Sequence, residues 1–275
     1  MPTPTSGTIS INDINTVFGR GNNLNAYRGT IWYQPNSLVF GYFSSGAISL
    51  SDFYNKQPND PASTGSITYA TPSTNTFTVP LYRNALTVEI WGAGGGGGGY
   101  GSSAVYSYTG GTSSFYDAYA YGGGGGQMAG TSRYGGNVYG AGGSGGTPVN
   151  GNTIALAGNA GYAGDSGVTG VGAGAPYGGG NATPGFRQTP AQYGTVPGGG
   201  GAGFYYDTGG KFPAVAGGGG SGAYAKSIWA AGSFAVGSAI TVIVGAGGQS
   251  GTDASGGYYP YGGVGGDGKI IVTWT

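Results

Sequence analysis

Residues 86–99 read LTVEIWGAGGGGGG, a strand-like segment that runs directly into a run of glycine. β-Branched and aromatic residues in Leu86–Trp91 alternate with other residues, as is typical of a β-strand. A glycine run can form neither an α-helix nor an ordinary strand without a large entropic cost. The extended threefold polyproline-II conformation is open to it, but that conformation has no internal hydrogen bonds. The amides of such a run must therefore bond to neighbouring segments, because unpaired buried backbone is costly.

Further glycine runs occupy 122–126, 198–201 and 217–220, and glycine makes up 68 of the 275 residues. Strand patterns at Ala239–Val244 and Lys269–Trp274 follow the glycine-dense middle of the chain, so strand patterns flank it on both sides. A flexible linker array is the alternative interpretation, but linkers need neither flanking strands nor 13% aromatic residues. We therefore expect a mainly β fold, a glycine-rich β-sandwich with polyglycine-II helices over residues 63–275.

Residues 1–62 lack glycine runs and contain an approximate internal repeat. Ser10 precedes Asp13 and Ser49 precedes Asp52 by three residues, which predicts two helix N-caps of the capping-box type. The first helix should end near Gly19, and the second should pass through Phe53 and Tyr54 and stop before Pro58. Such short helices are marginal alone, so we expect them to dock on other chains; packing on the chain's own C-terminal domain is the alternative. The apolar residues expected to make this assembly surface are Ile9, Ile11, Ile14, Val17, Phe18, Ile48, Leu50 and Phe53.

The composition argues against catalysis, metal binding and nucleic-acid binding. Cysteine and histidine are absent and Glu89 is the only glutamate, so thiolate, imidazole and paired-carboxylate chemistry have few candidates. Only 7% of residues are charged, and nine basic residues balance nine acidic ones. Nucleic-acid binding requires a basic surface, which this balance does not supply. We therefore expect no enzyme activity, cofactor, metal or nucleic-acid partner.

No apolar run is long enough to cross a bilayer, and residues 1–10 lack the basic and apolar parts of a signal peptide. The sequence predicts a protein made in the cytoplasm of its host cell, without membrane insertion.

The strand-into-glycine pattern of Thr87–Gly95, with partners in 240–248 and 262–274, resembles the glycine-rich domain of many phage tail proteins. It is also similar to the glycine-rich region of anaplastic lymphoma kinase and, more loosely, to polyglycine-helix tip adhesins of T-even-like phage fibres. The likeness covers about residues 67–275. The repeated Ser-Gly-x-Ile-Ser-x-x-Asp elements, with residues 24–29, resemble N-terminal parts of phage structural proteins.

The resemblance implies a virion protein of the tail or a fibre, attached to other virion proteins through residues 1–62. By analogy with fibres, a homotrimer is expected. The expected function is recognition of the host surface, either a glycan or an outer-membrane protein. The first alternative is a purely structural role, as a capsid decoration, a head fibre or a tail appendage. A depolymerising enzyme is a third class, for which the paired carboxylates are missing.

Tyrosine, with 23 copies, is the candidate recognition residue. It offers a large, rather rigid contact area with a polar tip, as in antibody paratopes, and loops on a scaffold tend to carry recognition. Residues 100–121 are expected to form an exposed loop. The alternative is that the tyrosines cap the glycine bundle or pack between subunits. The candidate receptor-binding residues are Tyr100, Tyr106, Tyr108, Phe115, Tyr116, Tyr119, Tyr121, Tyr205, Tyr206, Tyr258 and Tyr259.

Overall fold

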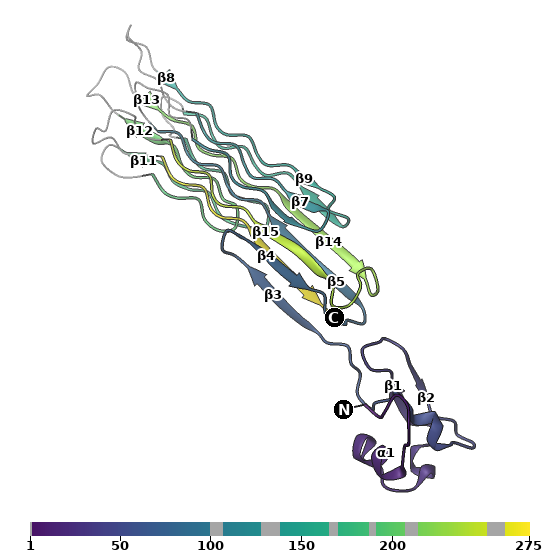
Figure 1. Ribbon diagram of the computed structural model, residues 1–275. Coiled ribbons are helices and arrows are strands. Elements are labelled where there is room, and N and C mark those ends of the chain that lie inside the picture. Colours follow the sequence, from purple (N-terminus) through teal and green to yellow (C-terminus); the bar gives the residue numbers. More distant parts are fainter. Residues whose placement is uncertain are drawn as a thin grey trace.

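The computed structural model describes residues 2–99, 107–127, 138–164, 170–186, 191–206, 214–251 and 262–275. A small N-terminal module is followed by an elongated domain made of sheets and long glycine-rich segments (Figure 1). The two parts have separate hydrophobic cores. The mainly β fold expected from the sequence is confirmed.

Short elements form the N-terminal module. The helix α1 spans Ile11–Phe18, the 3-10 helices span Leu24–Tyr27 (η1) and Leu50–Phe53 (η2), and a hairpin joins Ile31–Tyr33 (β1) to Phe40–Tyr42 (β2). Both predicted capping boxes are present. In the first, the Ser10 N–H donates to the Asp13 carboxylate at 2.7 Å and the Asp13 N–H donates to Ser10 Oγ at 3.2 Å. The Ser10 hydroxyl also donates to the Asp13 carboxylate at 2.7 Å, and this bond together with that from the Ser10 N–H lowers the pKa of Asp13.

The second predicted helix is shorter than expected. It is a single 3-10 turn that ends at Phe53, because the next residues turn away to bond the N-terminal segment. Asn55 has a positive φ of 53° and its N–H donates to the Pro4 carbonyl, while the Lys56 N–H donates to Thr3 Oγ1. Asparagine tolerates this left-handed conformation better than most residues. The helix prediction over 54–57 was therefore wrong.

Two five-stranded sheets pack on each other in the C-terminal domain. One has the order β10-β14-β5-β16-β3 and the other β4-β15-β6-β7-β9, and the side chains between them form the larger core. Inward-facing Leu86, Val88 and Ile90 of β5 are fully buried, as the alternation in that segment predicts. The strands of the first sheet are β3 (Gly65–Tyr69), β5 (Ala85–Trp91), β10 (Ile154–Leu156), β14 (Tyr224–Ala230) and β16 (Lys269–Trp274). Those of the second are β4 (Ser73–Thr78), β6 (Ser113–Phe115), β7 (Ala118–Ala120), β9 (Pro148–Val149) and β15 (Ala239–Val244).

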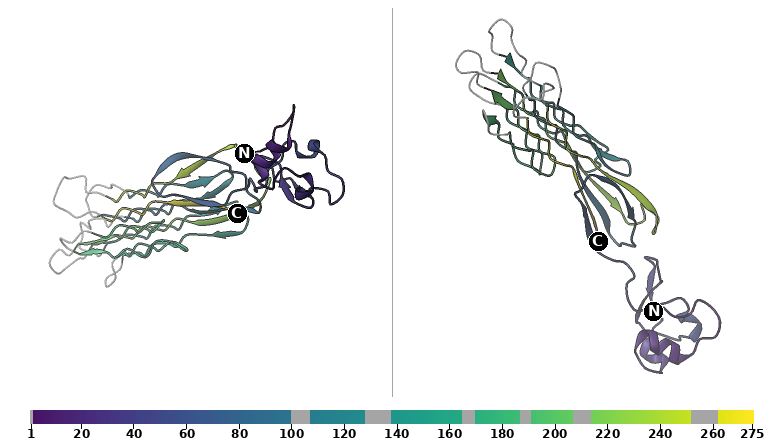
Figure 2. Two further views of the ribbon diagram at one scale, coloured as in Figure 1. Left: turned by 90° about the horizontal axis from the view of Figure 1, so that it is seen from below. Right: turned by 60° about the vertical axis from the view of Figure 1, so that its left-hand side comes forward.

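A third sheet of short strands, in the order β11-β12-β13-β8, lies at the end of the domain opposite the N-terminal module (Figures 1 and 2). Its strands are β8 (Val138–Tyr139), β11 (Gly185–Phe186), β12 (Phe204–Tyr206) and β13 (Ala214–Val215). Between this sheet and the sandwich run extended segments, which we call glycine threads. They are residues 92–99, 107–111, 122–127, 140–146, 157–164, 170–174, 198–203, 216–222, 245–251 and 262–268.

The thread 92–99 is hydrogen-bonded to six neighbouring segments, and each contact repeats after three residues. Its N–H groups donate to three antiparallel neighbours, and its carbonyls accept from three parallel ones. The donated bonds, from N–H to oxygen, are Ala93–Gly111, Gly96–Tyr108, Gly94–Gly266, Gly97–Gly263, Gly95–Gly220 and Gly98–Gly217, all 2.8–3.0 Å long. The accepted bonds are Gly123–Ala93, Gly126–Gly96, Gly248–Gly94, Gly251–Gly97, Gly201–Gly95 and Phe204–Gly98. Residues 93–98 of this thread thus bond their N–H and carbonyl groups to neighbouring segments instead of to one another.

Close approach of backbones explains why these positions are glycine. A Cβ on Gly94 would overlap the carbonyl oxygen of Gly199, and one on Gly97 would overlap that of Ala202. Neither obstacle is a flexible side chain that could move aside. The packing of the threads therefore leaves no room for a side chain at these closest contacts, and the side chains that are buried in the bundle are small, such as those of Ala93, Ala202 and Ser221.

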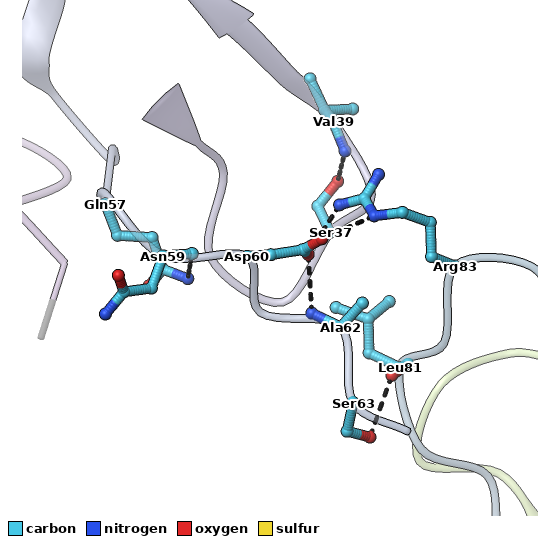
Figure 3. Close-up of polar contacts among 9 residues, drawn as sticks. All are labelled: Ser37, Val39, Gln57, Asn59, Asp60, Ala62, Ser63, Leu81 and Arg83. Atoms are coloured by element: carbon cyan, nitrogen blue, oxygen red, sulfur yellow. Dashed lines mark hydrogen bonds and ion pairs between the residues drawn. The ribbon is translucent and has the colours of Figure 1, made fainter. Parts of the chain in front are cut away.

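A short connector joins the module to the domain (Figure 3). Arg83 donates from Nε and from one terminal nitrogen to the two carboxylate oxygens of Asp60, both at 2.6 Å. Its guanidinium also lies 5.7 Å from the ring of Tyr33 and 5.4 Å from that of Phe40, on the β1–β2 hairpin. The connector ends where β3 begins, at Gly65. One arginine of the domain therefore contacts both the connector and the module.

Candidate functional site

The predicted recognition residues fall into several different places. Tyr100, Tyr106, Tyr258 and Tyr259 lie outside the described residues. Tyr205 and Tyr206 belong to β12 in the far sheet. Tyr108 is exposed on a glycine thread and Tyr121 is exposed just after β7.

The structure corrects two predictions: that Phe115 binds a receptor, and that the described residues 113–120 belong to an exposed loop. Phe115 is fully buried between the two sheets, where it packs against Phe77 and Trp229, so it cannot contact a receptor. Residues 113–120 form the β6–β7 hairpin instead of an open loop. The serine and alanine residues on these strands hid the pattern, since Ser113, Ala118 and Ala120 are small but buried.

Tyr116 and Tyr119 are brought together in a groove of about 500 Å³ on the outer face of β15, β6 and β7. We call it the aromatic groove. Its walls combine aromatic, aliphatic and hydroxyl-bearing side chains, and none of the described residues in them is charged. The lining residues are Ser114, Tyr116, Tyr119, Phe234, Ser238, Ala239, Ile240, Thr241 and Ile243.

The local structure of Tyr116 is unusual. It follows β6 in the tight turn of the hairpin with φ of 55°, a left-handed conformation that costs a bulky residue of order 1–3 kcal/mol. Tyr116 is 59% exposed, and its ring packs edge-on against Phe234 with the ring centres 5.1 Å apart. Phe234 contacts Trp229, which in turn contacts the buried Phe115. The aromatic wall of the groove is thus supported from the core.

Strand alternation is the signal that could have found the outward-facing lining residues of β15. In β15 the side chains of Ile240, Val242 and Val244 are buried, while Ala239, Thr241 and Ile243 are exposed. Phe234 carries no such signal, because it lies in the turn before β15 and reaches the groove only through tertiary packing.

The predicted assembly residues lie mainly inside the N-terminal module. Ile9, Ile14, Phe18 and Phe53 are buried in its own core, and Ile11, Val17 and Ile48 are partly buried against it. The prediction that these residues dock on other chains is therefore wrong for the four buried ones. Their apolar area is already covered by the core of the module, which includes Tyr27 and Phe43. Leu50 is exposed. The exposed apolar residues that the sequence analysis missed are Val39, Phe40 and Tyr42, on and beside β2.

Charged groups are few in the described part of the chain, and the one ion pair among them joins Arg83 to Asp60. Tyr224 donates from its hydroxyl to Glu89 at 2.7 Å, and burial together with this bond raises the pKa of Tyr224 strongly. Within the described residues, no group of three or more His, Cys, Asp or Glu side chains is placed to hold a metal ion. Neither Tyr224 nor Glu89 lines the aromatic groove.

Comparison with known proteins assigns the chain to no family. The chain matches no protein-family model, and no curated protein matches its sequence. Among the described residues, no helix has both the length and the apolar character needed to span a bilayer.

Proposed function

We propose that the chain is a non-catalytic structural protein of a bacteriophage tail or fibre that presents tyrosine-bearing surfaces for host recognition. The observation that supports this most strongly is the hydrogen bonding of the glycine threads. Because each thread is bonded to several others, the bundle can hold exposed side chains in fixed positions without a conventional core. Rigid presentation lowers the entropic cost of binding.

We further infer that the threads adopt the polyglycine-II conformation. Contacts that repeat every third residue, with six neighbours around one thread, are what a threefold helix with external hydrogen bonds requires. Glycine at the closest contacts supports the same inference.

The arrangement of the chain supports attachment at one end and display on the domain. The N-terminal module has its own core and exposes Val39, Phe40 and Tyr42, which suit contact with another virion protein. We also propose that the chain forms a homotrimer and that its receptor is a glycan or an outer-membrane protein. The absence of histidine and cysteine from the chain supports a non-catalytic role.

The groove supports recognition of an uncharged surface. Tyr116, Tyr119 and Phe234 offer aromatic faces, while Ser114, Ser238 and Thr241 offer hydroxyl groups. A cavity of about 500 Å³ with this mixture is of the size and chemistry that small-molecule sites use.

The location of the protein on the particle is the first test. Antibodies raised against the purified chain should label the tail or its fibres in electron micrographs of intact particles. Label confined to the head would favour the decoration role instead, and particles without label would overturn the proposal.

Cell binding is the second test. The purified full chain should bind the cells that the particle infects, and the double variant Tyr116→Ala/Tyr119→Ala should bind at least tenfold more weakly. Tyr193→Ala is the matched control, because Tyr193 is 69% exposed and lies outside the groove. Equal binding by the double variant and the Tyr193→Ala control would show that the groove does not bind the cell surface.

A further inference from the structure

A second cavity, of about 620 Å³, lies on the flank of the glycine bundle and contains none of the residues predicted from the sequence. We call it the Asn–Tyr furrow. It lies where the thread 157–164 runs beside the thread 170–174. The lining residues are Asn159, Ala160, Gly161, Tyr162, Ala163, Ala173, Gly174 and Asn181.

The threefold repeat of the thread explains why the polar residues share a face. Gly158, Gly161 and Gly164 donate their N–H groups to Gly146, Gly143 and Gly140, at 2.8–2.9 Å. Glycine at every third position therefore faces the neighbouring thread. Asn159 and Tyr162 are also three residues apart, so they lie together on a different face.

Two asparagine side chains are fixed on a single residue of the adjacent thread. Asn159 Nδ2 donates to the Gly174 carbonyl at 2.8 Å, and the Gly174 N–H donates to Asn181 Oδ1 at 2.6 Å. Each amide thus keeps one group for a ligand, the oxygen of Asn159 and the amino group of Asn181, since the described residues offer these two groups no further partner. Amides held in this way lose little further freedom when a ligand binds.

The aromatic ring and the floor complete the furrow. Tyr162 is 59% exposed, and its N–H donates to the Val171 carbonyl, which ties its backbone to the adjacent thread. The lining residues at 160, 161, 163 and 173 are alanine or glycine, which add no large side chain to the furrow. No charged side chain is among the lining residues that the structure describes, and this lining favours a neutral ligand.

We propose that the Asn–Tyr furrow binds a neutral pyranose unit of a surface polysaccharide. The Tyr162 ring packs against the C–H face of the sugar, and the free groups of Asn159 and Asn181 bond to its hydroxyls, one accepting and one donating. This inference rests on the proposed display function and adds a site and a ligand class to it.

The probe is a panel of immobilised neutral hexose and N-acetylhexosamine oligosaccharides, with uronic-acid oligosaccharides as the charged comparison. The full chain should bind at least one neutral oligosaccharide, whose dissociation constant is then measured by titration calorimetry. Tyr162→Ala should weaken that binding about tenfold or more. Tyr193→Ala, with the same change at another exposed tyrosine, should not alter it.

Asn181→Asp separates a ligand contact from a structural one. The carboxylate keeps an acceptor for the Gly174 N–H but removes the amino donor and adds a charge. It should weaken sugar binding about tenfold, while amide exchange at Gly158, Gly161 and Gly164 stays as in the parent chain. The exchange measurement shows that the thread remains folded.

Three results would overturn the inference: no binding to any neutral oligosaccharide, binding to acidic ones alone, or full binding by Tyr162→Ala and Asn181→Asp. If neutral sugar binding survived both changes but was lost in Tyr116→Ala, the furrow would be rejected and the aromatic groove retained. The titration uses purified protein, so its failure is distinguishable from failure to find the chain on a phage tail.

Discussion

The N-terminal module and the glycine bundle are stabilised by different kinds of contact. In the N-terminal module, side chains make the core: Ile14, Tyr27 and Phe53 are fully buried, and the rings of Phe43 and Phe53 stack at 4.1 Å. In the glycine bundle, backbone groups of neighbouring threads make the contacts, and the closest of these contacts leave no room for a side chain. The sandwich lies between these two regions. Its strand β5 has buried side chains and continues directly into the thread 92–99, which is held by backbone hydrogen bonds.

The difference teaches that a small core and a large backbone network should respond to opposite kinds of substitution. A core is damaged when atoms are removed, since the cavity left behind is not refilled. A bundle of threads is damaged when atoms are added, because carbonyl oxygens already occupy the space.

The largest expected effect is in the module. Phe53→Ala removes a fully buried ring from a small core and should destabilise it by about 3–5 kcal/mol. Differential scanning calorimetry of the full chain should show loss of the module's transition, with the transition of the glycine domain unchanged. A parallel fall in both transitions would mean that the two regions unfold as one unit.

A somewhat smaller effect is expected from adding one methyl group to the bundle. Gly97→Ala places a Cβ against the Ala202 carbonyl and should destabilise the glycine domain by about 1–3 kcal/mol. Gly46→Ala is the matched control in the module, because its Cβ would meet only Ser44 Oγ at 3.5 Å. Thermal unfolding followed by circular dichroism measures both, and equal midpoints would contradict the packing of the threads.

The smallest expected effect concerns the contact between the two regions. The hydrogen bond from Arg83 lowers the pKa of Asp60, so the folded carboxyl loses its proton more readily than the unfolded one. The stabilisation is therefore present above the ordinary aspartate pKa of about 3.9 and is lost as the pH falls through the folded value. Both side chains are about one-third exposed, so solvent screening limits it to about 0.5 kcal/mol.

Asp60→Asn should remove this pH-dependent part. The difference in stability between pH 7 and pH 3 should shrink in the variant and also shrink for the parent chain in high salt. A pH dependence that is identical in the two proteins would show that the ion pair contributes nothing to the junction.

The candidate surfaces were only partly predictable. Tyr116 and Tyr119 could be selected by residue type, but Phe115 beside them is buried, and no local pattern separates it from its neighbours. The Asn–Tyr furrow did leave a signal, glycine at 158, 161 and 164 with Asn159 and Tyr162 at matching spacing. That signal identifies a face of a thread but not its neighbour, so Asn181 could not be assigned to it.

The sequence by itself determined the kinds of local structure. Alternation in 86–91, 239–244 and 269–274 specified strands, the Ser-x-x-Asp pairs specified helix starts, and glycine runs required bonding between segments. These features depend on neighbours along the chain, which the sequence displays directly. Only the tertiary structure decided which thread lies beside which, that β14 pairs with β5, and which tyrosines stay exposed. Glycines carry no side chain to encode a partner, so the order of the threads follows from the packing of the whole domain.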